Sequence, residues 1–310
     1  MESSKRRFKQ KHPVMAAIAI LAGVFVVAWF GMTFFFNHFG SPRSGLFGAG
    51  SAKIGVVEVK GMITSSEEVI RVLTSFRKNR NIAAIVLRIE SPGGAVGASQ
   101  EIFEEVKRTR QVMPVVASMG SVAASGGYYA ALGANKIVAS PGTLTGSIGV
   151  IIKFPNFAEI FEKIGYKSEV VKSGKMKNIG SPGRSMTEAE RELIQSIIDN
   201  VHGQFVNAVI EGRELPAEKV LEFADGRIFS GEQALQAGLI DRFGNFTDAV
   251  ELAAKLAGLE EKLPELVYPA QKDFSLLKLL FGSRGNALFE EAVFLQPLLS
   301  YEWNASRLLE

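Results

Sequence analysis

Short apolar segments alternate with amphipathic segments through most of the chain. The apolar segments are rich in Val, Ile and Ala, and they predict buried strands at residues 53–63, 82–90, 114–120 and 136–140. The intervening segments have apolar residues at helical spacing, and they predict helices at residues 64–79, 95–110 and 121–133. Strands that alternate with helices predict an α/β domain built around a parallel sheet.

Two of the predicted helices begin with the sequence of a capping box. Thr64 is followed by Glu67, and Thr187 is followed by Glu190. The helix that begins after Thr187 extends to about residue 214. Its apolar stripe is formed by Ile194, Ile197, Ile198, Val201, Phe205 and Val209. We expect this stripe to pack on the domain's own sheet, with another subunit as the alternative.

The N-terminal region has the pattern of a membrane anchor. Residues 15–36 contain no charged residue and are long enough to cross a bilayer, which needs about 20 apolar residues. Five basic residues precede this segment: Lys5, Arg6, Arg7, Lys9 and Lys11. Because the next basic residue is Arg43, the charge pattern keeps the N-terminus in the cytoplasm and places the rest of the chain outside it. A cleaved signal peptide is the alternative, but no small-residue cleavage site clearly follows Phe36.

The sequence therefore divides into five segments. They are a basic cytoplasmic tail (1–14), a transmembrane anchor (15–36), a Gly- and Ser-rich linker (37–52), a folded domain (53–262) and a C-terminal segment (263–310). The last segment has apolar patches that could join the core, dock on the membrane or form interfaces.

Composition narrows the possible chemistry. The chain has 310 residues, 47% of them hydrophobic, and no cysteine, which excludes disulfides, thiolate metal sites and a cysteine nucleophile. The formal net charge of +3 comes from the basic N-terminal tail. The remainder has no basic stripe, so we expect no nucleic-acid partner.

The segment GSVAASGGYY contains a candidate nucleophile, Ser125, beside two glycines. A serine needs a neighbouring base to take its proton. Two of the three histidines, His12 and His38, flank the predicted anchor, and His202 lies in the long helix, where we expect a surface or core role. With a single histidine in the folded region and no cysteine, no metal site is expected either.

Lysine is the remaining base. A lysine accepts a proton only when it is neutral, which requires burial in an apolar cleft, because its ordinary pKa is about 10.4. Lys172, Lys175 and Lys177 follow a strand-like run, and a continued strand would place Lys175 and Lys177 on one face. Spacing does not choose among the three.

Two glycine-rich segments could complete such a site. ESPGGAVG can direct backbone N–H groups at an oxyanion, although an ordinary strand-to-helix turn is the simpler interpretation. TLTGSIGV is most simply another turn.

Together these segments resemble the signal peptide peptidase A family of serine–lysine peptidases, in its short single-domain bacterial form. The resemblance rests on SPGG (91–94), SMGSVAASGGYY (118–129), TLTGSIGV (143–150), KSGKMKNIGSP (172–182) and ADGRIFSGEQALQAGLID (224–241). It implies a Clp protease/crotonase-like α/β fold, a spiral of ββα units, behind a single N-terminal transmembrane helix. In that case residues 53–262 are the peptidase domain.

The resemblance also implies a role for five residues. Ser125 would be the nucleophile and Lys177 the general base, while Ser147 would orient the lysine. The backbone N–H groups of Gly94 and Gly126 would form the oxyanion hole. No cofactor or metal is implied.

The implied function is degradation of remnant signal peptides, and possibly of other membrane or envelope peptides. The family implies a homo-oligomer with active sites at subunit interfaces, anchored in the bacterial cytoplasmic membrane with an extracytoplasmic catalytic domain. Two alternatives remain at this stage: a crotonase-like acyl-CoA enzyme, and a catalytically inactive membrane-tethered assembly module of the same fold.

Overall fold

The computed structural model describes residues 21, 23–31, 52–259, 264–269 and 300–302. The chain separates into two compact units, Met1–Gly50 and Ser51–Glu310. In the first unit, residues 21 and 23–31 are helical and exposed. None of the helices in the described ranges is both long and apolar enough to span a bilayer. The other residues of the predicted anchor, 15–20, 22 and 32–36, lie outside the described residues.

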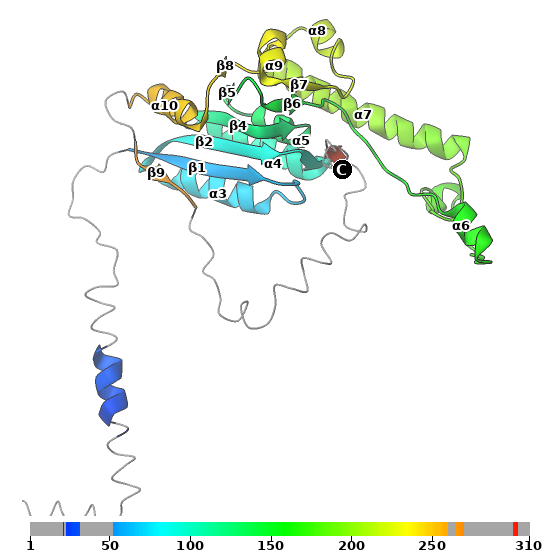
Figure 1. The fold of residues 1–310 in the computed structure, drawn as a ribbon, viewed down its shortest axis with the longest axis horizontal. Helices are drawn as coiled ribbons and strands as arrows, with labels where there is room; N and C mark the ends of the chain where they lie inside the picture. Colours follow the sequence, from blue (N-terminus) through cyan, green and yellow to red (C-terminus); the bar gives the residue numbers. More distant parts are fainter. Residues whose placement is uncertain (1–20, 22, 32–51, 260–263, 270–299, 303–310) are drawn as a thin grey trace, which may run out of the picture. The chain divides into compact units, whose positions relative to one another are not determined.

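The second unit is built on an eight-stranded sheet (Figure 1). Its main path has the order β7-β6-β4-β2-β1-β9; off this path, β5 pairs with β4, and β8 pairs with β5. The strands are β1 (Lys53–Lys60), β2 (Ile82–Ser91), β4 (Val115–Ala124), β5 (Lys136–Ala139), β6 (Leu144–Gly146), β7 (Ile228–Ser230), β8 (Arg242–Phe243) and β9 (Leu266–Val267). All pairs are parallel except β6 with β7, so the predicted mixed α/β fold with a parallel sheet is confirmed.

Helices cover both faces of the sheet because the central strands bury side chains on both sides. The helices of one face are α3 (Glu67–Lys78), α4 (Val96–Arg110), α5 (Gly126–Ala131) and α7 (Glu188–Arg213), and α10 (Phe246–Leu256) covers the other face. In β2, Ile85 and Leu87 join the first core, while Ala84 and Val86 pack in the second core with α10. This alternation is the period of two that a strand imposes on its side chains.

Most of the predicted elements are present, with two corrections in the first half of the domain. The helix predicted from residue 121 begins only at Gly126, because residues 121–124 continue β4, where Ala123 pairs with Ser91 and Ala124 pairs with Gly146. The capping box predicted at Thr64 is absent. Helix α3 starts at Glu67, and the hydroxyl of its N-cap residue, Ser66, donates to the carboxylate of Glu101 instead.

The long helix α7 has the capping box predicted at Thr187 and Glu190. Its apolar stripe is divided between two environments. Val201, Phe205 and Val209 are buried in the first core, whereas Ile197 is 40% exposed. The C-terminal half of α7 therefore packs on the domain, as expected, and the N-terminal half lacks that cover from the described residues.

Residues of the predicted C-terminal segment 263–310 pair with strands of the domain. β9 lies beside β1, and β10 (Ser300–Glu302) forms a separate two-stranded antiparallel sheet with β3 (Gly93–Ala95). Tyr301 of β10 is fully buried and stacks on Tyr129, with their ring centroids 5.2 Å apart. The hydroxyl of Tyr301 donates to the carbonyl of Val201 at 3.2 Å.

The segment between β6 and α7 contains little regular structure. It includes α6 (Ala158–Lys163) and a short 3₁₀ helix, η1 (Lys175–Asn178), and none of residues 151–189 is buried. The strand considered for Lys175 and Lys177 is therefore wrong. A 3₁₀ helix has three residues per turn, so residues two apart do not share a face. Two short helices follow α7, namely α8 (Ala217–Leu221) and α9 (Gly231–Ala237).

Candidate active site

Ser125 occupies a sharp turn between β4 and α5. The strand ends at Ala124 and the helix begins at Gly126, so the whole change of direction falls on this one residue. Its φ of 55° and ψ of −116° are unusual for a residue with a side chain, and such a conformation costs on the order of 1–3 kcal/mol. Strained backbone of this kind is typical of functional sites, and it supports Ser125 as a candidate functional residue.

The side chain of Ser125 is enclosed and has no partner. The residue is 1% exposed, and its Oγ is buried without a hydrogen bond to any described residue. Buried hydroxyls are normally hydrogen-bonded, because an unsatisfied polar atom costs about 1–3 kcal/mol. The orphaned hydroxyl and the strained turn together make Ser125 a candidate nucleophile.

Ser147 lies beside Ser125 at the end of the neighbouring strand. Ala124 and Gly146 are paired in the β4–β6 ladder, so Ser125 and Ser147 each follow one member of the same pair. Ser147 is 7% exposed, has a φ of 50°, and donates its backbone N–H to the carbonyl of Arg227 at 2.8 Å. The structure therefore brings these two predicted site residues together.

Gly94 and Gly126 also meet at this turn, along with Gly93, which the sequence analysis did not single out. A methyl group on Gly126 would lie 3.1 Å from the backbone nitrogen of Gly94, and one on Gly93 would lie 2.7 Å from that of Gly126. Gly93 has a φ of 106°, which side chains rarely permit. Only glycines allow the backbone segments around Ser125 to approach this closely. In the sequence, the two adjacent glycines of SPGG were the feature that indicated this close approach.

Lys177 lies on η1, is exposed, and is not hydrogen-bonded to Ser125. The turn is held by its backbone, because the N–H of Lys177 donates to the carbonyl of Gly174 at 3.1 Å. Lys172 has a structural contact here, since its Nζ donates to the carbonyl of Lys175 at 2.7 Å. Within one chain, then, four of the five predicted site residues are brought together, and Lys177 is not.

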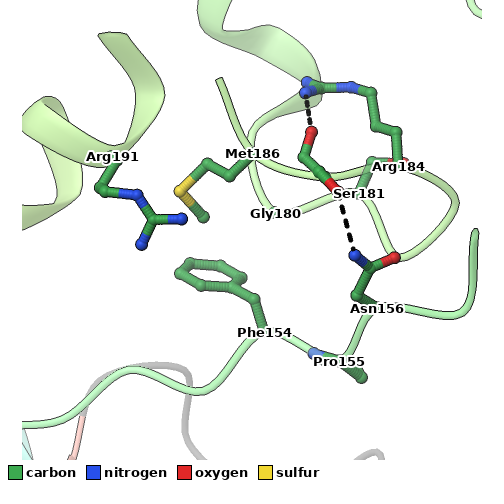
Figure 2. Close-up of a pocket in the computed structure, with 9 residues that line it drawn as sticks. Phe154, Pro155, Asn156, Gly180, Ser181, Arg184, Met186 and Arg191 are labelled. Atoms are coloured by element: carbon green, nitrogen blue, oxygen red, sulfur yellow. Dashed lines mark hydrogen bonds between the residues drawn. The ribbon is translucent and has the colours of Figure 1, made fainter. Parts of the chain in front are cut away.

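An ion pair and a pocket beside η1 were missed by the sequence analysis. Arg184 and Glu190 form a salt bridge, and Arg184 also donates to the carbonyl of Asn178 at 2.8 Å. The adjacent pocket has a volume of about 280 Å³. Its lining residues, drawn in Figure 2, are Phe154, Pro155, Asn156, Gly180, Ser181, Arg184, Ser185, Met186 and Arg191. The capping-box pattern predicted the position of Glu190 at the start of the long helix, but nothing in the local sequence indicated that Arg184 would be its partner.

His202 remains outside the site. Its Nε2 is buried without a hydrogen-bond partner in the described part of the chain. The described ranges contain no cluster of three or more His, Asp or Glu side chains that could hold a metal ion.

Comparison with known families and proteins agrees with these motifs. The model of peptidase family S49 matches residues 107–260, which include Ser125, Ser147 and Lys177. The Clp protease family model matches residues 55–143, from β1 to the residue before β6. The structure of the 1510-N membrane-bound stomatin-specific protease aligns with a TM-score of 0.47 at 20% identity, over 72% of this chain and 99% of that one.

Relatives match along most of the folded unit. The protein named "Putative protease slr0021" of Synechocystis sp. is 46% identical over 216 residues, covering 69% of this chain and 78% of that protein. The "Putative signal peptide peptidase SppA" of Enterococcus faecium is 34% identical over 70% of this chain, and the match spans 66% of the relative. The chain therefore belongs to peptidase family S49, the signal peptide peptidase A family, and it is a peptidase.

Proposed function

We propose that this chain is a membrane-anchored serine endopeptidase that uses Ser125 and Lys177 to degrade remnant signal peptides and possibly other membrane or envelope peptides. The observation that carries the proposal is the buried, unpartnered Oγ of Ser125 on a strained strand-to-helix turn. Membership of peptidase family S49 supports the reaction class, and the name of the Enterococcus faecium relative supports the substrate class.

The chemistry is acyl transfer. Lys177 Nζ takes the proton from Ser125 Oγ, and the Oγ attacks the carbonyl carbon of the scissile peptide. The N–H groups of Gly94 and Gly126 stabilise the oxyanion, and Lys177 then protonates the leaving amine. Water attacks the acyl-enzyme with the same base and regenerates Ser125. Ser147, which follows β6 as Ser125 follows β4, orients the lysine.

The two reacting side chains come from different subunits in this proposal. Ser125 is buried without a base, while Lys177 is exposed on a segment that also exposes apolar side chains. These side chains include Ile160, Ile164, Tyr166, Val170 and Val171. An apolar surface beside a needed catalytic group favours a homo-oligomer, because covering it with a second copy would bury Lys177 near Ser125.

The experiment is covalent labelling of the detergent-solubilised chain with a fluorophosphonate, followed by intact-mass measurement. We expect one adduct on the wild-type chain and on Lys175→Ala, and none on Ser125→Ala or Lys177→Ala. Lys175→Ala is the matched control, since it removes a neighbouring lysine from the same turn. Equal labelling of the two lysine variants would refute Lys177 as the base. A folded oligomer that is never labelled would instead favour an inactive assembly module.

The anchoring part of the proposal needs its own test. The charge-free segment 15–36 and the basic residues before it support a single span with the N-terminus in the cytoplasm and the peptidase domain outside. We expect the whole chain to stay with bacterial membranes after alkaline extraction, and a chain lacking residues 15–36 to be released. We would reject this orientation if a reporter that functions only in the cytoplasm were active when fused to the C-terminus.

A further inference from the structure

The turn that carries Lys177 lies on the surface, yet several of its backbone carbonyls accept hydrogen bonds. The carbonyl of Gly174 accepts from the N–H of Lys177, and that of Lys175 accepts from Lys172 Nζ. The carbonyl of Asn178, the residue after Lys177, accepts from Arg184 Nη2 at 2.8 Å. This last bond ties the end of the turn to residues outside it.

Arg184 joins three parts of the segment through one guanidinium group. Its two terminal nitrogens bind both carboxylate oxygens of Glu190, with Nη1 to Oε2 at 2.7 Å. Nη1 also donates to the carbonyl of Ser185 at 3.1 Å. A planar guanidinium can satisfy a carboxylate and a carbonyl together, whereas the ammonium of a lysine is a point charge.

The carboxylate of Glu190, which Arg184 binds, is itself held in place by helix α7. It is 2% exposed, and its carboxylate also accepts from the backbone N–H of Thr187 at 2.9 Å as part of the α7 capping box. The carboxylate therefore belongs to the first turn of a 26-residue helix whose other half is packed in the core. The path Glu190–Arg184–Asn178 links the lysine turn to that helix.

We propose that Arg184 is a positioning residue for catalysis, which holds the Lys177 turn in place by bridging the carbonyl of Asn178 and the carboxylate of Glu190. The inference rests on the proposed function, in which Lys177 is the general base. Arg184 does not touch the reacting atoms. Its effect comes from geometry, because misplacing a catalytic group by about 1 Å can cost on the order of 100-fold in rate.

The test compares Arg184→Lys and Arg184→Gln with Arg191→Gln in the whole, detergent-solubilised oligomer. Arg191 lines the same pocket, and its side chain has no hydrogen bond or ion pair with the described residues, so it is the matched control. We expect both Arg184 variants to lower kcat by about 10-fold or more, with KM changed less than about two-fold. Fluorophosphonate labelling of Ser125 should slow by a similar factor. Arg191→Gln should change each quantity less than about two-fold.

Local order of the turn provides a second measurement that needs no activity. Trypsin cleaves after lysine, so cleavage after Lys175 and Lys177 reports how often the turn opens. We expect faster cleavage there in Arg184→Lys than in Arg191→Gln. Arg184→Lys keeps a cation beside Glu190, so this variant should fold even if Arg184→Gln does not.

The possible failures are distinguishable. If Lys177→Ala retains activity, the proposed function itself fails. If Lys177→Ala is inactive while Arg184→Lys keeps the wild-type kcat and cleavage rate, only the positioning role is overturned. A rise in KM with kcat unchanged would also overturn it, since that result would place Arg184 in substrate binding.

Discussion

The backbone N–H of Ser125 donates to the carbonyl oxygen of Gly146 at 2.8 Å. This bond continues the β4–β6 ladder by one residue, and it attaches the turn at Ser125 to the residue that precedes Ser147. The strained backbone of Ser125 is therefore supported by the sheet and does not depend on the serine hydroxyl. The contributions of the side chain and the backbone can be separated by mutation.

We expect Ser125→Gly to be more stable than Ser125→Ala by about 1 kcal/mol. Glycine adopts a φ of 55° freely, which relieves strain of on the order of 1–3 kcal/mol but adds about 0.5–1 kcal/mol of chain entropy. Urea unfolding of both variants measures the difference, and neither should be labelled by a fluorophosphonate. Ser121 in β4 is the control position, where φ is negative and glycine should be the less stable substitution. An alanine variant as stable as the glycine variant would show that the turn is not strained.

Gly94→Ala should lower the free energy of unfolding by about 3 kcal/mol or more. Its new methyl group would overlap the carbonyl oxygen of Ile63 and lie 2.6 Å from the backbone nitrogen of the same residue, and backbone atoms cannot move aside easily. The control is Gly97→Ala in α4, where no atom lies within 4 Å. That substitution should be neutral or stabilising by up to about 1 kcal/mol. Chemical denaturation of the two variants checks the contrast.

Glu190 should make stability depend on pH in the acid range. Hydrogen bonds from Arg184, and then from the backbone of Thr187, lower the pKa of Glu190 to about 2. Because the pKa is lower in the folded state, the stabilisation is complete above the ordinary value of about 4.3 and is lost as the pH falls towards 2. The stability advantage of the wild type over Glu190→Gln should therefore shrink between about pH 5 and pH 2.

Urea midpoints at several pH values between 7 and 2.5 measure this effect. Glu188→Gln is the control, because Glu188 lies exposed in the same first turn of α7. Its difference from the wild type should vary less with pH. A constant difference between wild type and Glu190→Gln across this range would contradict the ion pair as described.

Tyr301 should contribute strongly to the stability of the domain. It is fully buried, and its ring contacts Tyr129 and Phe205. We expect Tyr301→Ala to cost about 3–5 kcal/mol and Tyr301→Phe, which loses the hydroxyl and its bond to the Val201 carbonyl, about 1 kcal/mol. The control is Tyr268→Ala, because Tyr268 is half exposed, and its effect should stay within about 0.5 kcal/mol. Equal unfolding midpoints for wild type and Tyr301→Ala would mean that β10 does not pack here in solution.

The sequence predicted those features that depend on local pattern. The apolar run of β2 and the capping box of α7 are both written in neighbouring residues, and the predicted buried strand and helix start are both confirmed. The glycines beside Ser125 were likewise visible, because close backbone approach requires residues without side chains.

The features that were missed depend on partners distant in sequence or on competing partners. Residues 121–124 have a composition compatible with a helix, but pairing with β2 and β6 makes them strand. Ser66 replaces Thr64 as the N-cap residue because α3 begins later than expected. Tyr301 reaches Tyr129 only through the tertiary fold, and no local period indicates such a contact. Lys177 is exposed on η1 and does not hydrogen-bond to Ser125 within this chain, so its pairing with Ser125 stays a prediction.

The pairing of β3 with β10 has a consequence for the order in which the molecule is made. A ribosome synthesises β3 and the Ser125 turn well before residues 300–302, with which β3 pairs. Until then the cluster of Tyr129 and Phe205 lacks its third ring, and the edge of β3 has no partner from β10. Contacts between residues so far apart in sequence form slowly. The surroundings of Ser125 are thus completed only after β10 has been translated.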